Sequence, residues 1–452
     1  MRASRTLFSV VLTTTISLSS LALALDGQSN AEYRARREKL ATKANGGIVL
    51  LFAPMEAQDA SELTGFRQDS DFFYLSGWAE PQAALLIASR SPATNTAPGH
   101  PYTEILFIPA HNFVAERWTG PKLGPESADA PRITGFDHVE AIDKLRDELA
   151  RLLPSAREDI YTDVPAFGET STSIEPLDWL KRADAFPGYA SFHDVKPLVA
   201  SLRLYKDSGE LERIRKATSA SVTAHLAAMH LVKPGVTERE VSALMQYEWG
   251  KRGCERPSYA PIVGSGFNST VLHYDQDSAT MQSGDLVVID AAGEYSMYAS
   301  DITRTLPVSG RFTARQREIY DIVLGAQRAA MAAFQSGKSN LRRGDDPDSL
   351  YKVALDYMNT HGKDMHGGSL GQYFIHGLGH YVGLNVHDAG DYTVPLGPGM
   401  VFTIEPGIYI PEEKLGVRIE DTVYVDQDGK LIDLAVDLPH TADEVERTMA
   451  GR

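Results

Sequence analysis

The stretch LVVIDAAGEYSMYASDITR, residues 286–304, places two aspartates, Asp290 and Asp301, where apolar strands would otherwise be buried. An apolar, β-rich run that ends in aspartate is unfavourable unless the carboxylate has a partner. The two acids are eleven residues apart, and the turn-prone Gly293 lies between them. They can therefore meet across a hairpin and hold a cation, although an aspartate in such a position can also simply cap a strand or begin a turn.

Length and composition predict a globular protein with two domains. The chain has 452 residues, of which 43% are hydrophobic, and this is more than one ordinary domain needs and enough for substantial cores. The formal net charge of −16 disfavours nucleic acids and anionic membrane surfaces as partners. Because Cys254 is the only cysteine, no intrachain disulfide can form.

The first 24 residues have the features of an export signal. Arg2 and Arg5 form a positive start, residues 7–23 are largely apolar or hydroxylated, and residues 22–24 read Ala-Leu-Ala, a cleavage-type tripeptide. An uncleaved membrane anchor is the alternative, but the run is short for a span and is diluted by serine and threonine. The sequence therefore predicts an exported protein, periplasmic or secreted, that begins near Leu25 and has no stable membrane insertion after cleavage.

Residues 25–193 are expected to form a first domain of the α/β type. Hydrophobic periodicity predicts helices over 33–44 and 141–153, and strands over 48–52, 83–88 and 104–108. Two segments rich in aromatic and polar residues, 66–78 and 117–120, lack the spacing of a cofactor loop. On residue type alone we interpret them as loops packed against the core of this domain.

Residues 194–452 are expected to form the second domain, after a boundary near 194–206. Start signals for four helices are found at Asp207, Thr237, Thr313 and Asp346-Pro347. Strand-like segments lie around residues 262, 286, 401 and 417. Helices that frame strand pairs, without strict βαβ alternation, favour an α+β domain with a mainly antiparallel sheet.

Three of the thirteen histidines, His376, His380 and His387, fall within twelve residues in the segment FIHGLGHYVGLNVHD, residues 374–388. The spacing of four between the first two is typical of a helical zinc pair, but three glycines make a helix costly and no glutamate follows His376. The segment is therefore expected to be extended and to bring its histidines to one surface.

Two glutamates, like Asp290, occupy strand positions where a buried carboxylate is unfavourable without a partner. Glu405 ends the apolar run 401–404, and Glu420 lies in an alternating strand that also carries Arg418. Like carboxylates about 4 Å apart repel by about 4 kcal/mol at an effective dielectric constant near 20, so four clustered acids need cations. Two divalent ions would balance four carboxylates with one neutral imidazole and leave room for a bridging hydroxide.

The order of these residues resembles the metallopeptidase family that includes aminopeptidase P, prolidase and methionine aminopeptidase. The motifs that carry the resemblance are IDA (289–291), ASDITRT (299–305), HGLGH (376–380), VHD (386–388), TIEPG (403–407) and VRIED (417–421). The resemblance implies a pita-bread metallopeptidase domain over 194–452, with a mainly antiparallel sheet flanked by helices. It also implies a creatinase-like, aminopeptidase P-type N-terminal α/β domain over 25–193, because residues 66–77 and Trp118 resemble that domain.

The same resemblance implies a site for two divalent metal ions. Asp290 would bind one ion, His380 and Glu405 the other, and Asp301 and Glu420 would bridge both. Glu405 would also orient or deprotonate the bridging water as a general base. Oxygen-rich ligation with one histidine is typical of manganese (Mn²⁺), with zinc, cobalt and iron as alternatives.

Three further histidines and one arginine gain roles by resemblance alone. His273 would be a first active-site histidine, His387 would stabilise the tetrahedral oxyanion, and His376 would shape a proline pocket or shuttle protons. Arg418, next but one to Glu420, is interpreted as a residue that orients the metal ligands.

The resemblance implies an aminopeptidase that removes the first residue from peptides with proline in second position. An Xaa-Pro bond is a tertiary amide without an N–H, so it needs a dedicated pocket. A prolidase that takes only Xaa-Pro dipeptides shares every ligand and stays open, and a catalytically inactive peptide-binding protein is a more distant alternative. We expect a homo-oligomer, a dimer or tetramer, in which Trp118 of a neighbouring subunit could close the pocket.

Overall fold

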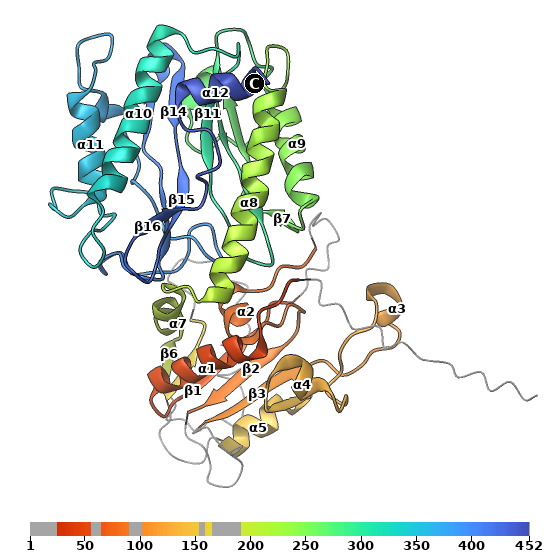
Figure 1. Cartoon of the computed structure of the whole chain (residues 1–452). Coiled ribbons are helices and arrows are strands. Elements are labelled where there is room, and N and C mark those ends of the chain that lie inside the picture. The colour runs from red at the N-terminus through yellow and green to blue at the C-terminus, as the bar shows by residue number, and fades with distance from the viewer. Residues whose placement is uncertain (1–24, 56–64, 90–101, 153–158, 165–190, 452) are drawn as a thin grey trace, which may run out of the picture.

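The computed structural model describes residues 25–55, 65–89, 102–152, 159–164 and 191–451, which form two domains stacked end to end (Figure 1). The predicted leader lies outside the described residues. Among the helices that are described, none combines the length and the apolar character that a bilayer crossing requires. Near the predicted boundary, residues 191–194 pair with the first sheet, and residues 196–203 form a helix that leads into the second domain. The exact boundary stays a prediction.

The N-terminal domain is built on a six-stranded mixed sheet. Its central strands β1, β2 and β3 are antiparallel neighbours, whereas β4, β5 and β6 are added to the edges in parallel. In the spatial order β4-β3-β2-β1-β5-β6, the strands are β1 (Ile48–Phe52), β2 (Ala84–Ala88), β3 (Thr103–Ile108), β4 (His138–Ala141), β5 (Asp159–Thr162) and β6 (Ser191–Asp194).

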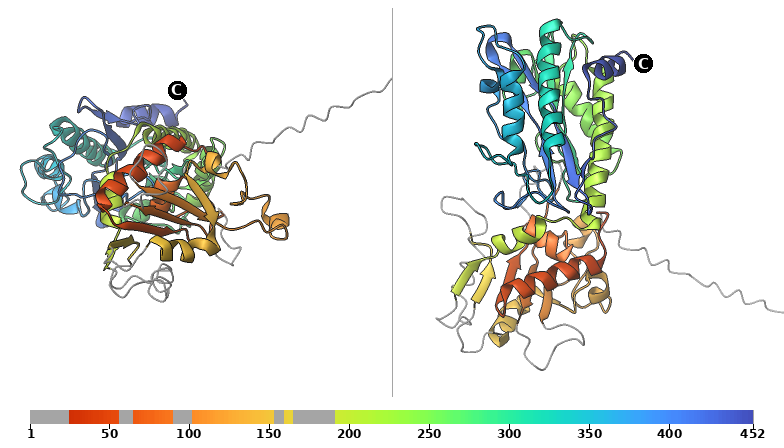
Figure 2. Two further views of the ribbon diagram at one scale, coloured as in Figure 1. Left: turned by 90° about the horizontal axis from the view of Figure 1, so that it is seen from below. Right: turned by 60° about the vertical axis from the view of Figure 1, so that its left-hand side comes forward.

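Helices cover both faces of this sheet, and the strand residues alternate between them as the pleat requires. Val49 and Leu51 pack on the side of α1, and Ile48 and Leu50 pack on the side of α5, so α1 and α5 lie on opposite faces (Figure 2). The helical elements described here are α1 (Asn30–Ala44), α2 (Ser70–Ser76), α3 (Glu116–Thr119), α4 (Ala130–Thr134), η1 (Ile142–Lys144), α5 (Leu145–Leu152) and α7 (Lys196–Arg203).

The predicted helices and strands of this domain are confirmed to within a few residues, but one of the two aromatic segments was interpreted wrongly. Segment 66–78 is packed, as expected, and it contains the buried helix α2. Segment 117–120 is not packed, because Trp118 is 89% exposed on α3, which projects from the domain (Figure 1). Residue type favours burial of a tryptophan, but the projecting loop carries this side chain away from the core.

The second domain has small antiparallel sheets flanked by two pairs of helices, which confirms the predicted α+β class. Helices α8 and α9 form one pair and α10 and α11 form another, and α12 contacts both α8 and α10 (Figures 1 and 2). Both pairs contribute to the hydrophobic cluster that covers the strands. The helical elements are α8 (Ser208–Leu231), α9 (Glu238–Gly250), η2 (Gly266–Thr270), α10 (Ala314–Ala333), α11 (Leu350–Thr360), η3 (Leu370–Tyr373), η4 (Pro411–Glu413) and α12 (Ala442–Met449).

The strands of this domain pair as β11-β9-β8, β12-β15-β16, β13-β14 and β10-β7. Every one of these pairs is antiparallel. Their bounds are β7 (Arg256–Pro257), β8 (Ile262–Ser265), β9 (Leu286–Asp290), β10 (Gly293–Glu294), β11 (Thr303–Pro307), β12 (Val401–Ile404), β13 (Gly407–Ile410), β14 (Leu415–Arg418), β15 (Asp421–Val425) and β16 (Leu431–Asp433).

Three of the four predicted helix starts are confirmed, since Asp207, Thr237 and Thr313 each form a capping box. The fourth was placed too early. Asp346 accepts a hydrogen bond from the backbone N–H of Asp348, which makes a turn, and α11 begins only after Ser349 caps it. Aspartate favours such turns as well as helix starts, so the pattern Asp-Pro did not distinguish them.

The single cysteine, Cys254, is buried beside Trp249 of α9 and Gly293 of β10. A side chain on Gly293 would come within 2.8 Å of both the Cys254 sulfur and the Trp249 ring, so the packing around the thiol is tight. Burial raises the pKa of the thiol to about 12, which keeps it protonated and unreactive.

Candidate active site

The two aspartates meet as the hairpin prediction requires. Strands β9 and β11 are antiparallel, and Asp290 faces Thr303, two residues beyond Asp301. The hydroxyl oxygen of Tyr259 lies 2.6 Å from one oxygen of each aspartate. Asp290 at the end of β9 and Asp301 just before β11 therefore bring two buried carboxylates together.

The two glutamates reach the same point from the neighbouring strands. Glu405 follows the last residue of β12, and Glu420 lies between β14 and β15. Backbone bonds join Glu420 to Thr303 in both directions, and the Thr303 hydroxyl also donates to the Glu420 carboxylate. Glu420 is thereby fixed beside the strand that begins next to Asp301.

The histidine-rich segment is extended, which confirms the rejection of a helical zinc pair. It runs along β12, because the backbone N–H of Thr403 donates to the His380 carbonyl and that of Glu405 donates to the Leu378 carbonyl. A side chain on Gly379 would lie 2.0 Å from the Thr403 carbonyl oxygen. Glycine is therefore required for the approach that sets His380 beside Glu405.

The five predicted ligands border one pocket of about 600 Å³. One ligand atom from each of Asp301, His380 and Glu420 lies within 4.8 Å of the others, and the His380 Nε2 atom is 3.3 Å from both Asp301 and Glu405. The predicted residues that line the pocket are Asp290, Asp301, His380, Glu405, Glu420, His273, His376, His387 and Arg418. Their individual roles stay predictions.

Three of the clustered, buried acids of the pocket have raised pKa values and therefore need positive charge nearby to stay ionised. Burial raises the pKa of Glu405 to about 7, and burial together with neighbouring acids raises the pKa values of Asp301 and Glu420. Burial opposes the charge on His380, but the hydrogen bond to Asp301 and the charge of Glu405 outweigh it and raise its pKa to about 9. Cations among these oxygens would relieve the repulsion and keep the acids ionised.

Arg418 links Asp290 to Tyr409 and, through the Tyr409 hydroxyl, to His376. Its Nη2 atom donates to Asp290 at 2.5 Å and its Nη1 atom donates to the Tyr409 hydroxyl at 2.8 Å. The Tyr409 oxygen lies 2.8 Å from Nε2 of His376. Burial and the charge of Arg418 lower the pKa of His376 to about 3, so this imidazole is neutral.

Sequence reasoning missed Tyr259 and Tyr409. Tyr259 follows Pro257 and Ser258 in an irregular segment, and Tyr409 alternates with apolar residues in β13. Neither has a charge, a metal-ligand chemistry or a spacing that separates it from a core tyrosine. Only the fold brings their hydroxyl groups to the carboxylates and to Arg418.

The sequence matches the model of metallopeptidase family M24 over residues 212–427 and that of the aminopeptidase P N-terminal domain over residues 33–161. It is 33% identical to the Xaa-Pro aminopeptidase of Escherichia coli (strain K12), across 94% of this chain and 98% of that protein. The chain belongs to metallopeptidase family M24.

Two further likenesses support this membership of family M24. The chain is 31% identical to the Xaa-Pro dipeptidase of Homo sapiens, across 90% of this chain and 89% of that protein. It superposes on the structure of aminopeptidase P from E. coli with the inhibitor Pro-Leu with a TM-score of 0.81 and 31% identity, across 94% of this chain and 99% of that one. The family resemblance and the pita-bread fold are thus confirmed, and the chain is a hydrolase, a metallo-aminopeptidase.

The donor set of the M24 domain fits divalent metal ions. It has four carboxylates and one imidazole at a single pocket, and hard divalent cations prefer such oxygen-rich surroundings. Arg418 is the one arginine that lines this pocket among the described residues, and it is engaged by Asp290. It is too little positive charge for four acids.

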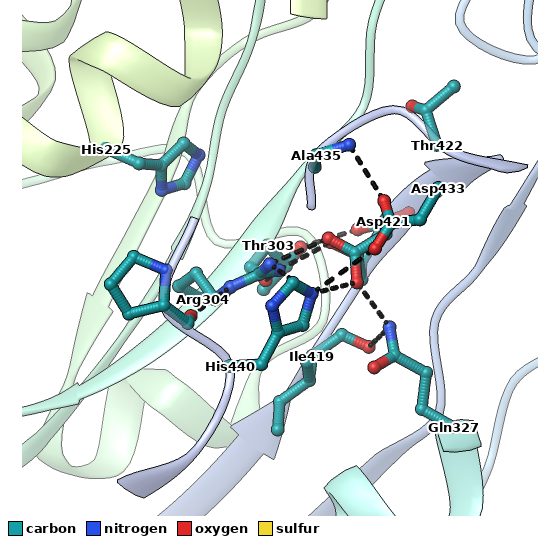
Figure 3. Close-up of polar contacts among 12 residues, drawn as sticks. His225, Thr303, Arg304, Gln327, Ile419, Asp421, Thr422, Asp433, Ala435 and His440 are labelled. Atoms are coloured by element: carbon teal, nitrogen blue, oxygen red, sulfur yellow. Dashed lines mark hydrogen bonds and ion pairs between the residues drawn. The ribbon is translucent and has the colours of Figure 1, made fainter. Parts of the chain in front are cut away.

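A second group, Asp421, Asp433 and His440, also has metal-ligand spacing, but it is filled by protein (Figure 3). Arg304 donates to Asp421 at 2.7 Å and lies 2.9 Å from Nε2 of His440. Its Nη1 atom donates to the carbonyl oxygens of Thr303 and Glu420. The guanidinium supplies the positive charge, so we interpret this group as a support for the backbone of the ligand strands.

Proposed function

We propose that the chain is a dinuclear-metal aminopeptidase that hydrolyses the bond between an N-terminal residue and a penultimate proline. The observation that carries the proposal is the convergence of Asp290, Asp301, His380, Glu405 and Glu420 on the wall of one pocket. The Xaa-Pro aminopeptidase of E. coli, which matches nearly the whole chain, supports the choice of substrate.

In the proposed site, Asp290 would hold one ion, His380 and Glu405 would hold the other, and Asp301 and Glu420 would serve both. The ions would supply an activated water and polarise the scissile carbonyl. Glu405, whose carboxylate oxygen lies 3.3 Å from His380, would accept a proton from the attacking water. We propose manganese as the resident metal, with zinc, cobalt or iron as alternatives, and metal analysis of the purified protein tests this.

The remaining pocket residues suit a neutral substrate carbonyl and a proline ring. His387 and His273 line the pocket and would hydrogen-bond the oxygen that gains charge during attack. His376 is held by the Tyr409 hydroxyl, so its ring is fixed and can form one wall for proline. Because an Xaa-Pro amide has no N–H to recognise, a pocket of fixed shape is what selects it.

Mass spectrometry of products from two substrates tests the proposal. Manganese-loaded protein is incubated in parallel with an Xaa-Pro dipeptide and with a longer peptide that has proline second. Release of one N-terminal residue from the longer peptide supports an aminopeptidase. If neither substrate is cleaved while metal is bound, the proposed function is wrong although the fold stands.

A prolidase is the second candidate, favoured by the match to the human Xaa-Pro dipeptidase over 90% of this chain. Cleavage of the dipeptide alone would select it.

We also propose that the protein is exported and forms a dimer or tetramer. The export signal in residues 1–24 supports the first proposal, and cell fractionation tests it. The exposed Trp118, with Phe113 and Val114 exposed by 75% and 71% on the same projecting segment, supports the second. Light scattering of the parent protein and of Trp118→Ala tests whether this segment makes the subunit contact.

A further inference from the structure

The loop of residues 384–388, which carries His387, has no helix or strand of its own. It lies at the pocket, where the His387 and His380 ring centroids are 4.2 Å apart. A loop without a backbone ladder is held by side-chain contacts and by individual backbone bonds. The origin of those contacts therefore decides how well His387 is placed.

Side chains from the N-terminal domain provide two direct contacts to this loop. Arg67 donates to the carbonyl oxygen of Leu384 at 2.6 Å, and Ser70 donates to the side-chain oxygen of Asn385 at 2.6 Å. Arg67 is itself fixed, because it also pairs with Glu294 in β10 at 2.9 Å. Both residues belong to the aromatic and polar segment 66–78, to which residue type alone assigned only packing within its own domain.

A buried ion cluster provides a third contact. Arg203, the last residue of α7, pairs with Asp71 of the N-terminal domain at 2.6 Å and with Asp388, which follows His387 directly. Lys206 pairs with the other oxygen of Asp388 at 2.8 Å. The side chains of Arg203, Lys206 and Asp388 are at most 4% exposed, so water cannot replace a lost partner and the ions fix one another.

Packing leaves the loop little room to adjust. A side chain on Gly383 would lie 2.2 Å from the Asp388 carboxylate, so the backbone passes directly against the ion cluster. Leu384 belongs to the hydrophobic cluster that also contains Phe72 and Leu75 of the N-terminal domain. Loop and domain thus form one packed unit rather than two surfaces that touch.

From these contacts we infer that the N-terminal domain positions His387, through Arg67, Ser70 and the Asp71–Arg203–Asp388 cluster. The catalytic consequence rests on the proposed function, because it takes the role of His387 from there. Asp71 and Ser70 act through the loop and contact neither the substrate nor the metal ligands. A displacement of a catalytic group by about 1 Å can cost on the order of 100-fold in rate, so loosening these contacts lowers kcat.

The test compares Asp71→Asn and the milder Ser70→Ala with a matched control, Arg36→Gln. Arg36 forms another ion pair between the domains, with Asp207 at 2.6 Å. The Arg36 side chain is 3% exposed and that of Asp207 is 35% exposed, and the contacts of Arg36 do not reach residues 384–388. Amide hydrogen exchange is measured in the metal-loaded full-length protein. In the two loop variants the amides of residues 383–388 should exchange about tenfold faster than in the parent, whereas Arg36→Gln should leave them unchanged.

A double-mutant cycle with His387→Ala tests the catalytic consequence. Asp71→Asn should lower kcat about tenfold in the parent background, with KM within about threefold, but less than about twofold when His387 is already absent. Equal losses in both backgrounds, or unchanged exchange in the loop variants, would overturn the inference. A parent protein that cleaves no Xaa-Pro peptide would instead refute the proposed function, and the exchange measurement would still test the positioning.

Discussion

Raising the pH from 6 to 9 should destabilise the M24 domain, and His440 should supply a defined part of that loss. Burial opposes a charge on this side chain, but hydrogen bonds to Asp421 and Asp433 outweigh burial and raise its pKa from 6.5 to about 9. Arg304 faces it from β11 and opposes the charge, and Glu444 of α12 accepts from its backbone N–H. Because the folded pKa lies above the unfolded value, the stabilisation is complete below about pH 6.5 and is lost as the pH rises through about 9.

The size of this effect follows from the pKa shift. A folded pKa of about 9 against 6.5 corresponds to at most about 3 kcal/mol between pH 6 and pH 9, at about 1.4 kcal/mol for each unit. The side chain is 18% exposed, so screening by solvent takes away only a minor part. For a domain of this size, about 3 kcal/mol corresponds to a fall in Tm of roughly 6–12 °C.

Calorimetry of the parent protein and of His440→Gln, both in EDTA at pH 6 and pH 9, measures the effect. Glutamine keeps a hydrogen-bond donor but cannot gain a proton, so the fall in Tm between the two pH values should be smaller in the variant by the contribution of His440. The raised pKa values of His380 and Glu405 contribute equally to both proteins in EDTA. His366→Gln is the control, since His366 forms an exposed pair with Glu412 that is worth little. The same fall in Tm in the parent and in His440→Gln would refute the reasoning.

Three further results are expected at the metal centre. Asp301→Ala should remove both metal ions and all turnover, and full metal content in that variant, measured by mass spectrometry, would contradict the ligand assignment. Gly379→Ala should cost about 1–3 kcal/mol and weaken metal binding, because the new Cβ atom would lie 2.0 Å from the Thr403 carbonyl oxygen; calorimetric titration with Mn²⁺ that gives an unchanged affinity would exclude this. Dialysis against EDTA should abolish peptidase activity and added Mn²⁺ should restore it, so activity that survives in metal-free protein would argue against a metallopeptidase.

Local chemistry was enough to predict the parts of the site in which a polar residue interrupts an apolar pattern. Asp290 and Glu405 stand out because each ends a buried strand, and the glycines around His380 exclude a helix by their conformational cost. Helix starts were equally local, since a capping box involves residues only three positions apart. These features need no knowledge of how distant segments meet.

What the sequence did not predict depends on pairings across the fold. Arg304 contacts His440, which is 136 residues away, and Tyr259 reaches Asp301 across 42 residues. In the sequence alone, nothing distinguishes Arg304, His440 or Tyr259 from other core or surface residues, because their partners are brought near only by the fold. Segment 66–78 shows the same limit, because its packing was predicted correctly but its contact with the loop of His387 was not.

Cys254 makes the protein suitable for site-specific spectroscopy. Its thiol is buried and its pKa is raised to about 12, so maleimide and nitroxide reagents, which react with the thiolate, should not label it. A cysteine introduced at the exposed Phe113 would then be the one reactive thiol, without any need to remove the native residue. A spin label or dye placed there could report directly how far apart two copies hold their projecting loops in solution.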